Sequence, residues 1–234
     1  MPRLTQVSAA GGSSSSALAF TPDLSTDAAD AIGSPPDSMV WLNSGALDSA
    51  AVSSGVLNAN HGATSTNIET TRNAPFGYWR VDVDPATPVV VYAKIQHTGD
   101  ASAEHAGLMI TKDADAYSTA YIAAGTRGGD TNFLIRHTST YIQWGTGKTA
   151  NLDTWIRMAL GVNEARVACQ QSTDTEPPTT GWENASLIDD VGKTTAGVLH
   201  SGILRVGMFV ATGNTSDNFE ANLKYLSING VRRL

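Results

Sequence analysis

The sequence predicts an all-β protein, an antiparallel β-sandwich preceded by an extended N-terminal arm. Apolar residues alternate at period two in several short segments, as half-buried strands require. Turn residues recur about every 8–12 residues, supplied largely by the 22 glycines and 9 prolines. Only 16% of the residues are charged while 41% are hydrophobic. The chain therefore lacks the charged solvent faces of typical helical proteins, yet it can bury a core.

The strands are expected in chain order, from the first alternating run onward. In Pro88–Gln96, every second residue from Val89 to Ile95 is apolar, so these side chains share one face. Further strands follow at Gly107–Thr111, Thr119–Ala123, Asn132–Arg136, Tyr141–Trp144, Trp155–Val162, Glu164–Gln170, Leu204–Val210 and Ala221–Ile228. Any helix is expected to be short, and Thr26–Ile32 is the best candidate.

The chain divides into a low-complexity arm, residues 1–36, and a sandwich domain, residues 37–234. The arm holds the run Gly11–Ser16 and ends at two prolines. It has too little apolar surface to fold alone. We therefore expect it to lie against its own domain or, preferably, to tether the chain to a neighbouring one. Its candidate anchors are Leu4, Val7, Leu18, Phe20 and Leu24.

Charge and composition exclude several classes of protein. With 15 basic against 22 acidic residues, a net charge of −7 and no basic stripe, nucleic acid is not expected as a partner. No apolar run approaches ~20 residues, so no membrane span is expected. The first residues do not form a signal peptide, which predicts synthesis in a cytoplasm. The single cysteine, Cys169, is expected to be a small buried residue rather than part of a disulfide.

No arrangement of residues for catalysis is evident, so the protein is not expected to be an enzyme. Glycoside hydrolysis needs two carboxylates at a defined separation, but the glutamates lie singly along the chain. Asp82 and Asp84 share a strand face, which is interpreted as a solvated one. No metal or other cofactor is expected. The histidines show no metal-ligand spacing and are expected at the surface or in loops; they are His61, His97, His105, His137 and His200.

Weak motifs over about residues 37–230 follow the order of concanavalin A-like lectin/glucanase sandwiches. They are Trp41, Gly45, Val52 and Gly55–Leu57; Ala106–Ile110 and Asp113–Tyr117; Trp155–Arg157, Arg166–Ser172, Asp174 and Trp182; and Val206–Phe209 and Phe219–Ala221. On these motifs the chain resembles the LamG/DUF1349-like members, and the resemblance implies a jelly roll. The chain departs from them at the inserted residues Thr175–Thr180.

The resemblance implies two kinds of site. Many such sandwiches bind sugars, with an aromatic face beneath the sugar ring and polar groups around it. The candidates are Tyr141, Gln143 and Trp144 on one hairpin, Arg136 beside it, and Trp182 on the inserted loop. Trp41, Trp79 and Trp155 are expected in the core instead. Such sandwiches also often hold calcium through hard oxygen ligands, and the candidates are Asp113 with Asp115, or Asp189 with Asp190.

These features favour a non-catalytic interaction protein of a large assembly. We expect a homo-oligomeric bacteriophage virion component, such as a capsid decoration, spike or tail protein. Its arm, residues 1–36, would bind other virion proteins while the sandwich faces the medium. The first alternative is a lectin-like module that binds a cell-surface glycan. The second is a glycoside hydrolase or polysaccharide lyase, because one fold can host many activities.

Overall fold

The computed structural model describes most of the sandwich domain. The described residues are 39–68, 73–83, 86–99, 103–112, 120–128, 133–137, 140–144, 148–149, 151–161, 165–187, 199–200, 202–213, 215 and 218–234. The predicted arm, its five anchors, the Thr26–Ile32 helix and the four calcium-candidate aspartates lie outside these residues. Within them, no helix is long and apolar enough to cross a membrane.

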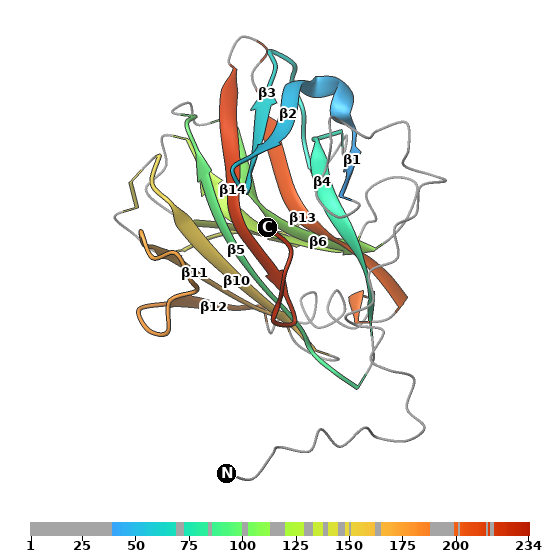
Figure 1. The fold of residues 1–234 in the computed structure, drawn as a ribbon, viewed down its shortest axis with the longest axis vertical. Helices are drawn as coiled ribbons and strands as arrows, with labels where there is room; N and C mark the ends of the chain where they lie inside the picture. Colours follow the sequence, from blue (N-terminus) through green and yellow to red (C-terminus); the bar gives the residue numbers. More distant parts are fainter. Residues whose placement is uncertain are drawn as a thin grey trace.

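Two stacked antiparallel sheets confirm the predicted β-sandwich (Figure 1). Sheet A contains β1 (Val40–Leu42), β4 (Phe76–Val83), β6 (Glu104–Lys112), β7 (Tyr121–Arg127), β8 (Phe133–His137), β9 (Thr140–Trp144) and β13 (Gly202–Thr212). Sheet B contains β2 (Leu47–Ser53), β3 (Val56–His61), β5 (Val89–His97), β10 (Thr154–Leu160), β11 (Ala165–Gln171), β12 (Glu183–Leu187), β14 (Phe219–Ile228) and β15 (Val231–Arg232). The order across sheet A is β1-β4-β13-β6-β7-β8-β9, and across sheet B it is β12-β11-β10-β5-β14-β3-β2, with β15 beside β14. The short 3-10 helix η4 (Ser44–Ala46) links β1 to β2.

Alternate residues of both sheets fill one core between the layers. Trp41 and Trp79 lie fully buried there, as predicted. Cys169 belongs to the same core, and burial raises the pKa of its thiol, so the group stays protonated. Trp155 is also buried, but it packs on the opposite side of sheet B, where its ring lies 5.0 Å from the ring of Tyr225.

The face of sheet A that points away from this core is apolar at its centre and lined by glycines. A second cluster of buried side chains lies on it and includes Tyr78 and Phe209. Gly107 and Gly125 face each other in β6 and β7, and a Cβ on either would lie 2.1 Å from a carbonyl oxygen of the other strand. At Gly207 a Cβ would lie 1.9 Å from the carbonyl oxygen of Gly77. The strands can approach this closely only because these positions lack side chains.

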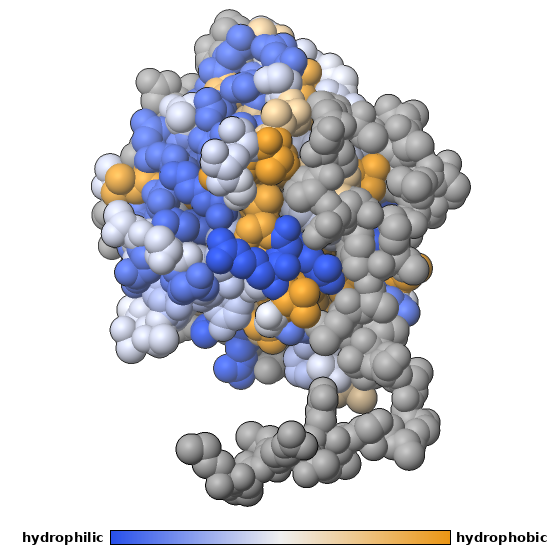
Figure 2. Space-filling model, in the orientation of Figure 1, coloured by the Kyte–Doolittle hydropathy of each residue, from blue (hydrophilic) through white to orange (hydrophobic). Residues whose placement is uncertain are grey.

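Residues 172–182, which include the inserted loop, lie across the outer face of sheet B. The ammonium of Lys94 donates to the carbonyls of Thr173 and Asp174, at 3.3 and 2.9 Å. It also lies 2.9 Å from a carboxylate oxygen of Asp153, which Lys224 contacts at 2.7 Å. We call residues 172–182 the strap. Figure 2 looks onto this side of the molecule, where hydrophilic residues predominate and hydrophobic ones form a narrow strip near the C-terminus.

Replacing Lys94 by methionine is expected to loosen the strap and to destabilise the fold. The change removes three interactions of a side chain that is only 8% exposed, and a hydrogen bond to a charged group contributes about 1.5–3 kcal/mol. We expect a loss of about 3 kcal/mol in chemical denaturation, with faster proteolysis within the strap. The control is Lys224→Met, whose side chain is 30% exposed and whose ammonium contacts Asp153 at 2.7 Å. An equal loss there would contradict the role of Lys94.

The expectation of surface histidines is wrong for most of them. His61 and His137 are fully buried, and His97 and His200 are nearly so. His97 ends β5 with its ring edge-on to that of Phe219, 6.1 Å away. Burial lowers the pKa of His97 to about 4, because an imidazolium ion is poorly solvated inside the sandwich. The sequence pattern could not show this, since a histidine at a strand end is buried only if the facing sheet covers it.

The stability of the protein is therefore expected to fall on acidification. Between pH 6.5 and pH 4, His97 binds a proton in the unfolded chain but not in the folded one, so unfolding becomes more favourable as the pH falls. The lowered pKa of His97 corresponds to about 3 kcal/mol over this window. Urea denaturation across the window tests this. His97→Asn should reduce the pH dependence without abolishing it, because the pKa values of His61 and His105 are also lowered; an unchanged slope would show that His97 does not contribute.

Candidate functional site

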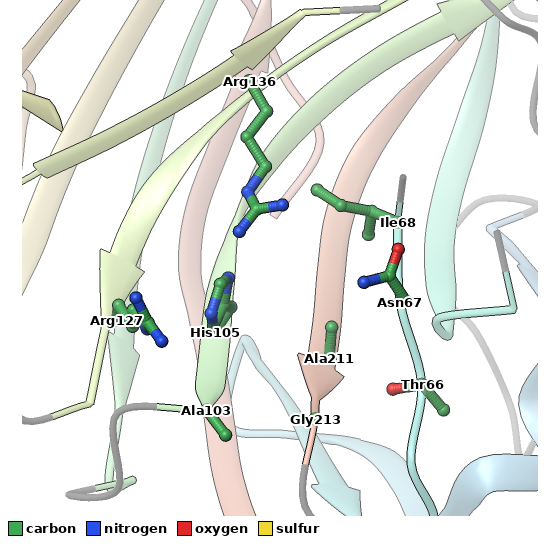
Figure 3. Close-up of a pocket in the computed structure, with 9 residues that line it drawn as sticks. All are labelled: Thr66, Asn67, Ile68, Ala103, His105, Arg127, Arg136, Ala211 and Gly213. Atoms are coloured by element: carbon green, nitrogen blue, oxygen red, sulfur yellow. The ribbon is translucent and has the colours of Figure 1, made fainter. Parts of the chain in front are cut away.

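A pocket opens on the outer face of sheet A, where three neighbouring strands place basic side chains together. His105 of β6 and Arg127 of β7 are direct partners in the ladder, and Arg136 follows on β8. In Figure 3 the Arg136 side chain extends toward His105, and Arg127 lies beside the imidazole. The segment containing Asn67 forms the opposite wall, and the amide of Asn67 points into the space between. The pocket encloses about 210 Å³.

A small hollow adjoins this pocket beside the glycine pair of β6 and β7. It begins at His105 and Arg136 and is lined further along by Gly125, Leu134 and Phe209. Because Gly107 and Gly125 carry no side chains, the backbone itself forms part of the floor. The hollow encloses only about 10 Å³, which is about the space of one water molecule.

The electrostatic environment of the pocket favours an anion. Burial, followed by the positive charges of Arg136 and Arg127 and then by His97, lowers the pKa of His105 to about 3. The imidazole is thus neutral at physiological pH, while the guanidinium groups remain charged. No acidic side chain is among the described residues that line the pocket. The described lining residues therefore contribute positive charge to the pocket, although the protein as a whole is acidic.

The opposite wall is held in place by a buried hydrogen-bond network centred on Thr66. The backbone N–H of Thr66 donates to the carbonyl of Thr212 at 2.7 Å, and the N–H of Thr212 donates to the Thr66 hydroxyl at 3.2 Å. His61 Nδ1 lies 2.7 Å from the carbonyl of Gly62 and must donate to it. In the neutral ring Nε2 then accepts from the Thr66 hydroxyl, 2.8 Å away. Burial lowers the pKa of His61, which favours this neutral form.

The structure separates the residues predicted to bind a glycan. Arg136 lines the pocket, and Tyr141 lies opposite it in the β8–β9 ladder. Gln143 lies opposite Leu134, and Trp144 lies opposite Phe133; the side chains of β9 are outside the described part of the structure.

Trp182 belongs to the other sheet. Its indole N–H donates to the carbonyl of Pro178 at 2.8 Å, within the strap. The guanidinium of Arg157 lies 5.1 Å from the Trp182 ring, and the ring of Tyr92 lies 6.0 Å away, both on sheet B. Trp182 and Arg136 therefore cannot contact the same sugar residue, because the core lies between the two sheets. Their roles in glycan binding remain predictions.

The sequence reasoning missed His105, Arg127 and Asn67. The first two become neighbours through the register of β6 and β7, which a single sequence does not reveal. One signal was present: His105 is followed two residues later by Gly107, and Arg127 is preceded by Gly125 at the same spacing. A glycine inside a strand often marks a place where another group approaches the backbone, so two such pairs indicated a groove.

Comparison with solved structures shows which proteins share this fold. A functionally unknown protein from Saccharomyces cerevisiae matches with a TM-score of 0.61 and 13% identity, covering 84% of this chain and 98% of that one. A structure described in terms of endo-acting O-glycanases, expressed by human gut microbiota to initiate mucin breakdown, matches with a TM-score of 0.57 and 10% identity, covering 84% and 94%. Alginate lyase A1-II′, of polysaccharide lyase family 7, matches with a TM-score of 0.51 and 14% identity, covering 76% and 81%. No protein-family model matches the sequence, and no curated protein sequence matches it.

These comparisons support a jelly-roll sandwich of the concanavalin A-like kind and correct one expectation. The prediction that the protein is not an enzyme is wrong, because an alginate lyase has the same fold over most of its chain. That prediction rested on the absence of a carboxylate pair, which is a requirement of glycoside hydrolysis. Elimination chemistry needs no such pair. The three structures give no support to a virion role.

Proposed function

We propose that this protein acts on an acidic polysaccharide, which it binds across the outer face of sheet A. The observation that carries the proposal is the pairing of two guanidinium groups with a neutral imidazole in one pocket. Guanidinium groups recognise carboxylates through paired, charge-assisted hydrogen bonds. The pocket volume suits one small anionic group rather than a long ligand, so the neighbouring sugars would lie outside the pocket. The sandwich fold that carries the pocket is shared with an alginate lyase.

The residues of the pocket favour β-elimination over hydrolysis. Hydrolysis would require two carboxylates, and the described lining residues include none. In an elimination, Arg127 and Arg136 would neutralise the carboxylate of a uronic acid and so acidify the adjacent C–H. His105 would take that proton as the C–O bond to the leaving sugar breaks and a carbon–carbon double bond forms. The leaving oxygen would take its proton from water.

The bound anion also makes His105 a better base. Arg136 and Arg127 both lower the pKa of His105, after burial, and an anionic group between them would offset their charges. The imidazole is then basic only when substrate is present. This coupling supports the assignment of His105 as the proton acceptor, since a useful general base needs a pKa nearer to the working pH.

The test is an activity screen on polyuronates with detection of the unsaturated product. We expect absorbance from the new double bond with wild-type protein, and a loss of at least about 100-fold in His105→Gln, the range typical of a general base. His200→Gln is the matched control, because His200 lies outside the pocket and contacts the carbonyl of Thr87. An inactive wild-type protein that still binds polyuronates would overturn the reaction but not the binding.

The pH dependence of this activity gives a separate prediction. Because the pKa of free His105 is about 3, kcat/KM is expected to remain flat from neutral pH down to about 5. An ordinary histidine would instead lose activity as it protonates near pH 6.5. Steady-state kinetics on a polyuronate across this range distinguishes the two. An acidic limb near 6.5 would show that another histidine accepts the proton.

The assembly role remains a separate prediction. Its basis is the low-complexity composition of residues 1–36, which lie outside the described part of the structure. Binding of acidic polysaccharide on sheet A is compatible with an assembly role, because a virion protein that binds a host polysaccharide would need such a site. Locating the contacts of residues 1–36 would test the assembly role.

A further inference from the structure

A second pocket lies at the end of the sandwich where β14 begins. It encloses about 420 Å³, which is twice the volume of the pocket on sheet A. Binding sites for small molecules usually enclose ~300–1,000 Å³. Side chains of β2, β3 and β14 line this second pocket, together with Thr98, which directly follows β5. We call it the end pocket.

A row of hydrogen-bonding residues crosses three strands in the end pocket. Ser49, Asn60 and Glu220 are direct partners in the ladders of β2, β3 and β14. An alanine adjacent to each of them belongs to the core, so the row points to the outer face of sheet B. Thr98 holds one end of the row, because its backbone N–H donates to the Glu220 carbonyl at 2.8 Å and its hydroxyl accepts from the Glu220 N–H at 3.1 Å. These bonds leave the Glu220 carboxylate available to a ligand.

The end pocket has a packed base and space for a second carboxylate. The rings of His61 and Phe219 are stacked at the base, with centroids 5.5 Å apart and planes inclined by 12°, and both side chains are buried. The carboxylate of Asp48 lies against Gly62, where a Cβ would be 2.5 Å from the carboxylate oxygen. Only a residue without a side chain leaves this space. The site is therefore largely formed before a ligand binds.

The end pocket is acidic, whereas the pocket on sheet A is lined by basic residues. Asp48 and Glu220 supply carboxylates, and neither carboxylate accepts a hydrogen bond within the described part of the structure. Burial lowers the pKa of His61, which favours its neutral form. A uronate would be repelled here, whereas carboxylates and amides suit sugar hydroxyls, which both donate and accept. Among the described residues, no group of three or more histidine, cysteine or acidic side chains is arranged to hold a metal ion.

We propose that the end pocket binds an uncharged sugar residue of the same polysaccharide whose uronate occupies the pocket on sheet A, an assignment that rests on the function proposed above. The two pockets lie on either side of one hydrogen bond. His61 lines the end pocket, Thr66 lines the other, and His61 Nε2 lies 2.8 Å from the Thr66 hydroxyl. A polysaccharide that passes around this end of the sandwich therefore meets two pockets of opposite charge. The substrate class is a heteropolysaccharide that contains both uronates and neutral sugars.

Isothermal titration with two polymers at equal uronate concentration tests this inference. Rhamnogalacturonan alternates galacturonate with an uncharged sugar, while polygalacturonate contains only the uronate. We expect the wild-type protein to bind rhamnogalacturonan at least about 10-fold more tightly, because hydroxyls can donate to the two carboxylates. In the double variant Asp48→Asn, Glu220→Gln this preference should disappear, while the affinity for polygalacturonate should stay equal or rise as the repulsion is removed. Both replacements keep the shape of side chains that are not buried, so the fold should persist.

Glu176→Gln is the matched control, because it neutralises an exposed carboxylate that contacts Arg232 at 3.3 Å and lies outside the end pocket. This variant should keep the wild-type preference for rhamnogalacturonan. Equal affinity of the wild-type protein for the two polymers, or an unchanged preference in the double variant, would overturn the inference. Both results would leave the proposed function intact, since that function requires only binding of polygalacturonate and the unsaturated product. A wild-type protein that binds rhamnogalacturonan but not polygalacturonate, and forms no unsaturated product, would instead overturn the proposed function.

Discussion

Replacing Arg127 and Arg136 together by glutamine is expected to weaken binding of polygalacturonate at least about 100-fold. Each guanidinium is expected to donate charge-assisted hydrogen bonds to the acidic group, and such bonds contribute about 1.5–3 kcal/mol each. Two of them correspond to two or more orders of magnitude in Kd. Isothermal titration at fixed ionic strength measures the effect. The fold should persist, because both side chains lie on the outer face of sheet A rather than in the core.

The control for this prediction is Arg166→Gln. Arg166 is exposed on β11 of sheet B, so its loss removes one positive charge without touching the pocket. Binding that falls equally in both variants would indicate general attraction to a polyanion rather than a site. A neutral polysaccharide should bind the double variant and the wild type alike. Unchanged affinity for polygalacturonate in the double variant would place the acidic ligand elsewhere.

Substituting Gly207 by alanine is expected to prevent folding. The added Cβ would lie 1.9 Å from the carbonyl oxygen of Gly77 and 2.7 Å from the Cα of Tyr78. Both contacts are with the backbone of the neighbouring strand, so no side-chain rotation can relieve them. The ladder between β4 and β13 would have to separate at the centre of sheet A. Circular dichroism and the yield of soluble protein are the measurements.

Gly45→Ala is the matched control for that substitution. A Cβ at Gly45 meets no atom within 4 Å, so this variant should fold with nearly wild-type stability. If Gly207→Ala showed a native thermal transition, β4 and β13 would not need to approach each other this closely for the protein to fold. Failure of both variants would point to a general sensitivity to substitution instead.

The fold was predictable where one strand face met the core and the other met solvent. Pro88–Gln96 is such a case, and it became β5 within one residue at each end. The strand β4 was indicated only toward its end, where Arg80–Asp84 alternates polar and apolar residues, because residues 76–79 are all buried and show no alternation. The strand β2 was indicated only by the resemblance, since its small and polar residues carry little hydrophobic signal.

The candidate site was predictable only in part, for a reason of geometry. Arg136 was selected from local sequence, as a polar neighbour of an aromatic hairpin. His105 and Arg127 are 22 positions apart in the chain and meet only through the β6–β7 register. The burial of the histidines was missed for the same reason, because it depends on which side chains of the facing sheet cover them. The expectation that the protein is not an enzyme was wrong for another reason: it rested on the absence of a carboxylate pair, which only hydrolysis requires.

The wall network of His61 and Thr66 has a consequence for how this protein can change over evolution. It attaches the segment carrying Asn67 to the end of β13 through backbone and buried contacts that do not involve the Asn67 side chain. The floor opposite is bare backbone at Gly107 and Gly125. Substitutions at Asn67 are therefore expected to change the proposed ligand preference while the sandwich keeps its stability. The residues that hold this wall and the residue that faces the proposed ligand are thus different ones.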